Sequence, residues 1–169
     1  MNPLQPKQYL KIIFFLSLLG VIVSAYLTYI HYSHLTTPCD FNSSFSCSSV
    51  NRSSYAELGG VPVALLGIGV YTILGLLSLG LYYKWAEKLD WKIAQKLISS
   101  PVLLGISLLA LSFSLYLTYV EFFIIQSICI LCLFSQTLII GITLSSDQYQ
   151  RLENLKIETE KKQTEVLAL

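Results

Sequence analysis

The stretch that decides the fold is PVLLGISLLALSFSLYLTYVEFFIIQSICILCLFSQTLIIGITL, Pro101–Leu144. A helix that crosses a bilayer needs about 20 mainly apolar residues, so this run is about twice as long as one span. It must therefore turn back, and the polar residues Glu121 and Gln126 interrupt it near its middle. We predict two spans, 101–121 and 127–144, joined by a turn between them.

Two further segments, at about 12–30 and 61–83, are also long and apolar enough to span a membrane. Of the 169 residues, 54% are hydrophobic and only 12% are charged, whereas a soluble globular chain carries about 25% charged residues. The formal net charge of +1 gives no basic surplus for binding nucleic acid. The sequence therefore predicts an all-α fold, an integral membrane four-helix bundle over residues 1–144 with a polar tail at 145–169.

The basic residues predict how the spans are oriented, because Lys and Arg are enriched in cytoplasmic segments. They gather before span one, between spans two and three, and after span four: Lys7, Lys11, Lys84, Lys88, Lys92, Lys96, Arg151, Lys156, Lys161 and Lys162. With four spans these segments share one side, so we expect both termini and the tail to be cytoplasmic and the loop at 31–60 to be extracytoplasmic.

Val23-Ser24-Ala25 resembles a signal-peptidase site, and cleavage there would leave three spans. The apolar run continues past it to Ile30, which favours an uncleaved first span.

A short repeat links the two outward-running spans. Ser24–Ile30 and Ser114–Val120 are identical at five of seven positions, and Tyr29 and Tyr119 each precede a cysteine by ten residues. Tyrosines are common at membrane interfaces, but an interfacial belt does not explain the matched distance to cysteine. The chain is therefore interpreted as a doubled two-span unit, with one cysteine pair in each half.

The four cysteines, Cys39, Cys47, Cys129 and Cys132, all fall on the outer side of the predicted bundle. Residues three apart share a helix face, so Cys129 and Cys132 can form a disulfide at the outer start of span four. We expect Cys129 in the first helical turn, where the helix dipole favours the thiolate needed for exchange. Cys132 lies one turn deeper, where it can meet a lipid-soluble oxidant. Cys39 and Cys47 lie in a polar loop whose mobility suits exchange with an external protein.

Three other interpretations of the cysteines remain. The four could bind zinc, although a pair entering the membrane does not match structural zinc sites, and we predict no metal. The loop pair could be a static disulfide, as in many extracytoplasmic loops. The C-x-x-C could be two inert core cysteines.

Two polar features accompany the cysteines. A short helix capped by Ser53 or Ser54, with Glu57 in its first turn and Gly59-Gly60 ending it, is expected to cover the bundle as a lid. Pro62 suits the first turn of span two. Gln136 lies one turn below Cys132, and an amide inside a span is a candidate site because burying it is costly. It could bond a quinone carbonyl or a neighbouring helix.

The combination of these motifs resembles the vitamin K epoxide reductase family, its bacterial branch in particular, over roughly residues 10–145. The order of the motifs along the chain is specific for this family: a cysteine pair in a loop, a serine, Gly-x-x-Pro and then C-x-x-C. The resembling residues are Cys39, Cys47, Ser48-Ser49-Val50, Ser53, Tyr55-Ala56, Gly59, Pro62, Gly67, Tyr71, Ser114, Tyr116-Leu117 and Cys129-Ile130-Leu131-Cys132.

The resemblance implies a four-helix bundle around a quinone, capped by a short helix. It implies that Cys132 faces the quinone, that Cys129 exchanges with Cys47, and that Cys39 meets a thioredoxin-fold partner. It also places Ser53 near the quinone head and implies pocket-lining roles for Tyr55 and Leu117: these implied positions, with Gln136, make up the predicted quinone site.

Two positions depart from the animal members of that family. Gln136 stands where they place a tyrosine that bonds the vitamin K head group, and Asn51 stands where they place a pocket phenylalanine. Neither epoxide reduction nor coumarin sensitivity is therefore predicted. The chain also stops too early for a fifth span and fused thioredoxin domain, so we expect the partner to be a separate periplasmic protein.

The predicted function is a membrane thiol–quinone oxidoreductase of the bacterial inner membrane. It would oxidise its partner, reduce ubiquinone or menaquinone, and so drive disulfide formation in exported proteins. One alternative is a vitamin K epoxide or quinone reductase that supplies hydroquinone. Another is a non-catalytic four-span scaffold with a stapled loop, which predicts cysteines fixed in one redox state.

Overall fold

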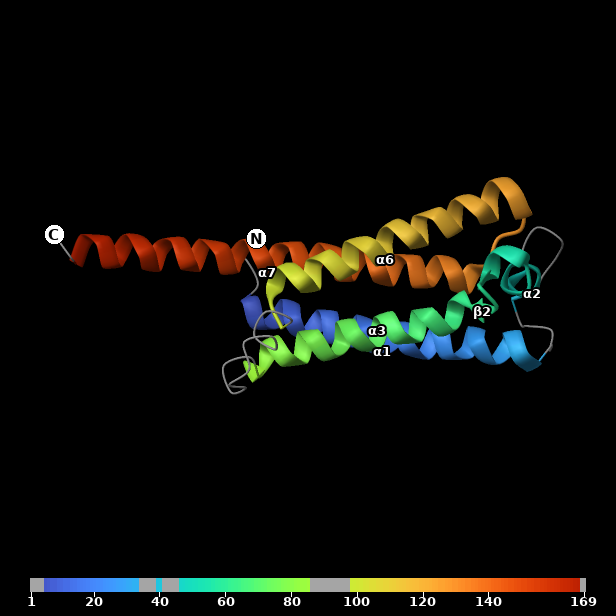
Figure 1. Ribbon diagram of the computed structural model, residues 1–169, viewed down its shortest axis with the longest axis horizontal. Coiled ribbons are helices and arrows are strands. Elements are labelled where there is room, and N and C mark those ends of the chain that lie inside the picture. Colours follow the sequence, from blue (N-terminus) through green and yellow to red (C-terminus); the bar gives the residue numbers. More distant parts are fainter. Residues whose placement is uncertain (1–4, 34–38, 41–45, 86–97, 168–169) are drawn as a thin grey trace.

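Four long helices lie side by side in the computed structural model, which describes residues 5–33, 39–40, 46–85 and 98–167 (Figure 1). They are α1 (Pro6–Ser33), α3 (Val63–Tyr82), α6 (Ser100–Val120) and α7 (Ile130–Leu167). Each is long and apolar enough to cross a membrane, α6 together with the turn that follows it. The prediction of an all-α membrane bundle is confirmed.

The spans differ from the predicted ones mainly at their ends. Helix α1 begins at Pro6, well before Ile12, and α7 begins at Ile130 instead of at 127. Helix α7 also continues as one helix through most of the polar tail and projects beyond the bundle (Figure 1). An ion pair between Arg151 Nε and Asp147 Oδ2, 2.9 Å apart and one turn apart on this helix, supports the continuation.

Small residues bring α1 and α3 close together. The Cβ atom of an alanine at Gly20 would overlap the ring of Tyr71, and one at Gly67 would lie 2.8 Å from Ser24 Oγ. Without a hydrophobic driving force between helices in lipid, close backbone approach is a main source of packing energy. The core formed on this framework consists of Leu10, Ile13, Tyr71, Leu74, Leu103, Ile139, Ile142 and Tyr149.

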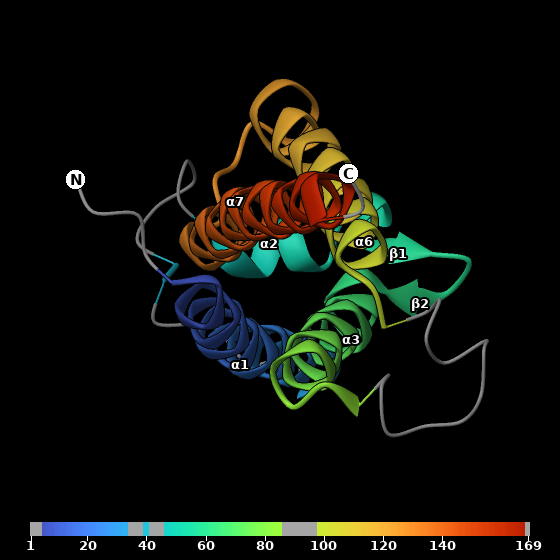
Figure 2. The ribbon, with the colours of Figure 1, turned by 90° about the vertical axis from the view of Figure 1, so that its left-hand side faces the viewer.

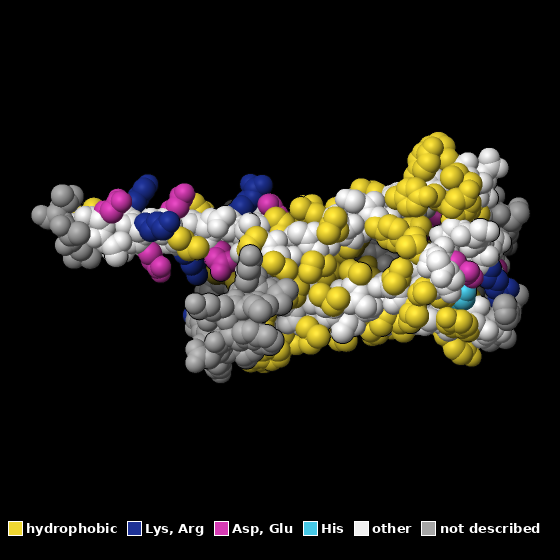
Figure 3. All heavy atoms as spheres, in the orientation of Figure 1, with side chains coloured by type: hydrophobic (Ala, Val, Ile, Leu, Met, Phe, Trp, Pro, Cys, Tyr) yellow, Lys and Arg dark blue, Asp and Glu magenta, His cyan; other side chains and the backbone are white. Residues whose placement is uncertain are grey.

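The two ends of the bundle differ in character. At one end, Lys11 Nζ lies 5.7 Å from the centroid of the Tyr82 ring, and Tyr83 stacks on Trp85. Lys and Arg side chains follow the projecting part of α7 beyond this end, while hydrophobic side chains cover much of the middle of the molecule on the face shown in Figure 3. The predicted basic residues Lys88, Lys92 and Lys96 lie outside the described residues.

A lid of short elements covers the opposite end. It consists of α2 (Cys47–Asn51), the 3-10 turn η1 (Ser54–Ala56) and a hairpin of β1 (Glu57–Leu58) and β2 (Val61–Pro62). Seen end-on, α2 crosses the space that the long helices enclose (Figure 2).

The predicted lid helix was wrong in its position. The helix starts earlier, at Cys47, and Glu57 lies in a strand instead of a helical turn. Gly59 and Gly60 have φ values of 62° and 84°, the backbone of a tight two-residue hairpin turn, so they join two strands and do not end a helix. Pro62 ends β2 directly before α3.

Candidate active site

The two cysteine pairs meet at the lid end of the bundle. Cys39 and Cys47 form a disulfide, and Cys129 and Cys132 are free thiols. Cys47 and Cys129 are fully buried and pack with Leu27 and Val50 in one cluster, against which Cys39 and Cys132 also pack. Four cysteines from two distant parts of the chain thus share one site.

Helix α2 holds Cys47 in this cluster through a network at its own start. Ser46 caps the helix, its Oγ accepting the N–H of Ser49 over 3.2 Å. The carboxylate of Asp40 accepts the N–H of Ser48 over 3.0 Å and the hydroxyl of Ser46 over 2.9 Å, and it also bonds the Ser48 hydroxyl. Because Asp40 follows Cys39 directly, the network fixes both ends of the disulfide-bonded loop.

Cys129 lies at the cap of α7, one residue before the helix, and not in its first turn as predicted. Its carbonyl accepts the N–H of Leu133 over 3.0 Å, and its sulfur accepts the N–H of Cys132 over 3.2 Å. The sulfur therefore takes the place that a serine or aspartate oxygen has at other helix starts. One N–H group at the start of α7 therefore still points at a sulfur of the reactive pair.

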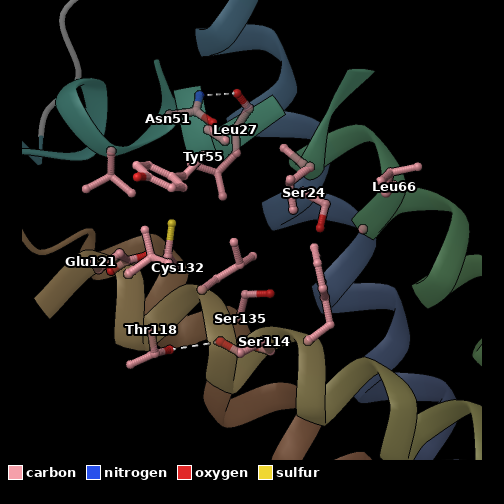
Figure 4. Close-up of a pocket in the computed structure, with 18 of the residues that line it drawn as sticks. Ser24, Leu27, Asn51, Tyr55, Leu66, Ser114, Thr118, Glu121, Cys132 and Ser135 are labelled. Carbon is pink, nitrogen blue, oxygen red and sulfur yellow. Dashed lines mark hydrogen bonds between the residues drawn. The ribbon is translucent and has the colours of Figure 1, made fainter. Parts of the chain in front are cut away.

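A cavity of about 180 Å³ lies beneath the lid, and residues of all four long helices, α1, α3, α6 and α7, line it. Helix α6 diverges from α3 toward the lid, which leaves room for it (Figure 1). Apolar side chains form most of its wall, and the sulfur of Cys132 points into it (Figure 4). An engineered apolar cavity of about 150 Å³ binds benzene, so this space admits an aromatic ring.

Three of the four predicted quinone-site residues line this cavity: Ser53, Tyr55 and Leu117. The hydroxyl of Ser53 donates to the Val50 carbonyl over 2.8 Å, which leaves its lone pairs to accept a further bond. Tyr55 is 45% exposed and lies at the lid side of the cavity (Figure 4).

Gln136 lies elsewhere. It is buried, but it is not among the lining residues, and its amide oxygen accepts a hydrogen bond from the Ser114 hydroxyl on α6. Of the two roles that the sequence left open, the structure shows the bond to a neighbouring helix. Contact with a quinone stays a prediction without support from this geometry.

Asn51 lines the cavity, at the pocket position that the resemblance indicated, and it also ties the lid to α1, which the sequence did not indicate. Its Nδ2 donates to the Leu27 carbonyl over 2.8 Å, and its own carbonyl lies 2.8 Å from His31 Nδ1. His31 Nε2 lies 3.3 Å from Glu57 Oε1, so one ring bridges two parts of the lid.

Glu121 is a cavity residue that was not predicted from the sequence. It was interpreted as part of a polar turn, but its side chain is only 4% exposed and lines the cavity. Its Oε2 accepts the N–H of Cys129 over 3.3 Å, and the carboxyl group lies close enough to the Cys132 thiol to interact with it. The signal was present, because an ionisable residue within a span is a site candidate by default.

Glu121 reaches the cysteines because α6 does not end where its apolar run is interrupted. It continues as one wider, π-helical turn, η2 (Glu121–Ile125), and the chain reverses only at Gln126, which has a φ of 55°. The Glu121 carbonyl accepts the N–H groups of Gln126 and Ser127. Backbone and side chain of this one residue thus anchor the loop that carries Cys129.

The comparison with protein families agrees with this site. The model of the vitamin K epoxide reductase family matches residues 11–146, a region that contains the four spans, the lid and both cysteine pairs. The chain therefore belongs to the vitamin K epoxide reductase family and is a multi-pass membrane oxidoreductase of that type.

Proposed function

We propose that this protein is a thiol–quinone oxidoreductase that oxidises a separate thioredoxin-fold partner and reduces a membrane quinone. By doing so it would drive disulfide formation in exported proteins. One observation carries the proposal: Cys132 belongs both to the cysteine cluster and to the wall of the apolar cavity. A thiol with this double contact connects exchange between sulfurs to a lipid-soluble oxidant.

The electrons move in three balanced steps. The partner's dithiol reduces the Cys39–Cys47 disulfide and leaves as a disulfide. The Cys47 thiolate then attacks Cys129 of an oxidised Cys129–Cys132 pair, and Cys39 resolves the mixed disulfide, which re-forms the loop disulfide and leaves the inner pair as two thiols. Finally the inner pair forms its disulfide while two electrons and two protons pass to the quinone, giving the hydroquinone.

The cavity suits the head group of ubiquinone or menaquinone. Its wall is largely aliphatic and aromatic, with polar atoms from Asn51, Ser53 and Tyr55 gathered at the lid. Such a lining buries a ring and offers a few polar groups that orient its oxygens. The isoprenoid tail, too large for this space, would lie between helices or in lipid.

The orientation follows from the charges. The lid end carries the cysteines, whereas Lys11 and the basic residues of α7 belong to the other end. Basic residues favour the cytoplasmic side, and disulfides persist in the oxidising periplasm. We therefore place the protein in a bacterial inner membrane with the lid facing the periplasm.

The test is quinone reduction by the purified full chain in detergent, with a reduced thioredoxin-fold protein as donor. Ubiquinone or menaquinone absorbance should decrease in the wild type and not in Cys132→Ala. In the variant, exchange between donor and the loop pair should persist, as a maleimide gel-shift assay would show. Folded wild type that reduces neither quinone would refute the proposal and favour the scaffold interpretation.

A further inference from the structure

We propose that Glu121 is a catalytic residue of this site: its carboxyl group takes the protons released by the inner cysteine pair and delivers them into the cavity. The inference rests on the proposed function, because it assigns the proton path of the same quinone step.

The first argument is geometric. The Glu121 carboxyl accepts the backbone N–H of Cys129 and lies close enough to the Cys132 thiol to interact with it, so it is near both members of the pair. It also lines the cavity into which the Cys132 sulfur points (Figure 4). A general base must lie within hydrogen-bond reach of the proton that it removes, and Glu121 meets this condition.

The second argument concerns the other groups in reach. Among the described residues, the cavity wall contains one carboxyl group, that of Glu121, and no Lys, Arg or His. The remaining ionisable groups there are Cys132 itself and the hydroxyls of Tyr55 and Tyr71. The Tyr71 hydroxyl lies 2.9 Å from the Ser135 carbonyl and 2.8 Å from its hydroxyl, on the α7 side of the wall. Glu121 is therefore the acid–base group best placed between the thiols and the cavity.

The third argument is the cost of keeping the side chain there. A carboxyl group that is 4% exposed within a span is expensive to bury, and such residues mark proton paths and binding sites. Capping the loop before α7 would need only a neutral acceptor. A glutamine would offer the same acceptor to Cys129, so positioning alone does not require a carboxylic acid.

The proposed step balances. The Glu121 carboxylate takes the proton of the Cys132 thiol, and the thiolate forms a covalent bond to a ring carbon of the quinone. Glu121 gives that proton to a quinone oxygen and returns to the carboxylate. Cys129, whose sulfur accepts the N–H of Cys132, gives up its proton by the same route to the second oxygen and attacks the Cys132 sulfur. This attack breaks the bond between Cys132 and the quinone ring, and its electron pair stays on the hydroquinone. The products are the Cys129–Cys132 disulfide and the hydroquinone.

The test is a single-turnover reaction of fully reduced protein with quinone, which needs no partner. Glu121→Gln keeps the side-chain volume and the acceptor for Cys129, and it should slow quinone reduction by about 100-fold or more, the scale of general acid–base catalysis. Its rate should also rise roughly tenfold per pH unit, because solvent hydroxide must then remove the thiol proton. Asp147→Asn, the same chemical change on the projecting part of α7, should behave as the wild type.

The pH profile separates catalysis from positioning, because a merely displaced cysteine would be slower by the same factor at every pH. Glu121→Gln within about twofold of the wild type at all pH values, with Cys132→Ala inactive, would overturn the inference and leave the proposed function intact. A wild type that reduces no quinone would overturn the function instead. If the Gln variant does not fold, Glu121→Asp replaces it, and it should keep the wild-type pH dependence at a lower rate.

Discussion

The side-chain amide of Asn51 donates a hydrogen bond to the backbone carbonyl of Leu27 over 2.8 Å. Asn51 ends α2, and Leu27 lies in the outer part of α1, so this bond joins the lid to the first span. Both residues also line the cavity. The lid is therefore attached to the bundle at the wall of the site that it covers.

Asn51→Asp should loosen this attachment, because it replaces the donor with an oxygen that faces another oxygen. Loss of a buried hydrogen bond costs about 1–3 kcal/mol, and about 1.4 kcal/mol corresponds to a tenfold change in binding. We expect the KM for quinone to rise about tenfold, measured by steady-state quinone reduction. Thr72→Val on the exposed side of α3 is the control, and equal KM values for the two variants would contradict this role.

Gly20→Ala should disturb the wall of the cavity through Tyr71. The new methyl group would overlap the Tyr71 ring, and overpacking of this kind costs about 1–3 kcal/mol. Thermal unfolding in detergent, followed by intrinsic fluorescence, should shift to lower temperature, and quinone reduction should slow because Tyr71 lines the cavity.

Gly69→Ala is the matched control for this substitution. A Cβ at Gly69 meets no described heavy atom within 4 Å, so the variant should be as stable as the wild type or slightly more stable. Equal unfolding temperatures for the two alanine variants would show that the contact between Gly20 and Tyr71 is not a packing constraint.

Gln136→Leu distinguishes the two roles considered for this amide. If Gln136 only joins α6 to α7 through Ser114, the variant should lose about 0.6–1.7 kcal/mol of stability and keep its KM for quinone. The measurements are unfolding in detergent and steady-state kinetics. An increase in KM without loss of stability would indicate that Gln136 contacts the quinone.

Asp40→Ala should make the loop disulfide easier to reduce, because α2 loses the carboxylate that bonds Ser46 and Ser48. Reduction by dithiothreitol should become about tenfold faster, equivalent to one hydrogen bond to a charged group. A Cys129→Ala/Cys132→Ala background limits maleimide labelling to the loop pair. Asp40→Asn keeps one acceptor oxygen and should fall between alanine and wild type, and identical rates for all three would exclude the network as a restraint.

The sequence was sufficient for the spans because length and apolar composition decide whether a helix crosses a membrane. It also placed all four cysteines at one end, since charge bias sets the direction of every span at once. The predicted turn between spans three and four also agrees with the structure, in which the chain reverses at Gln126, a residue with a left-handed backbone conformation.

The lid and the role of Glu121 could not be predicted in the same way, because each depends on how a short segment folds back on itself. Gly59-Gly60 suits a helix end or a hairpin turn equally well, and only the pairing of β1 with β2 decides between them. Glu121 looks like a turn residue until η2 folds its carboxyl back onto Cys129. Gln136 has a partner on α6 that its position in sequence does not reveal.

Helix α7 carries Cys132 near its start and continues without a break to Leu167. At about 1.5 Å per residue, its 38 residues extend about 57 Å, whereas the hydrocarbon layer is about 30 Å thick. One continuous helix therefore joins the cysteine site to a segment that projects beyond the bundle (Figure 1). A change in the tilt of the projecting part would therefore also shift the end of the same helix that carries Cys132.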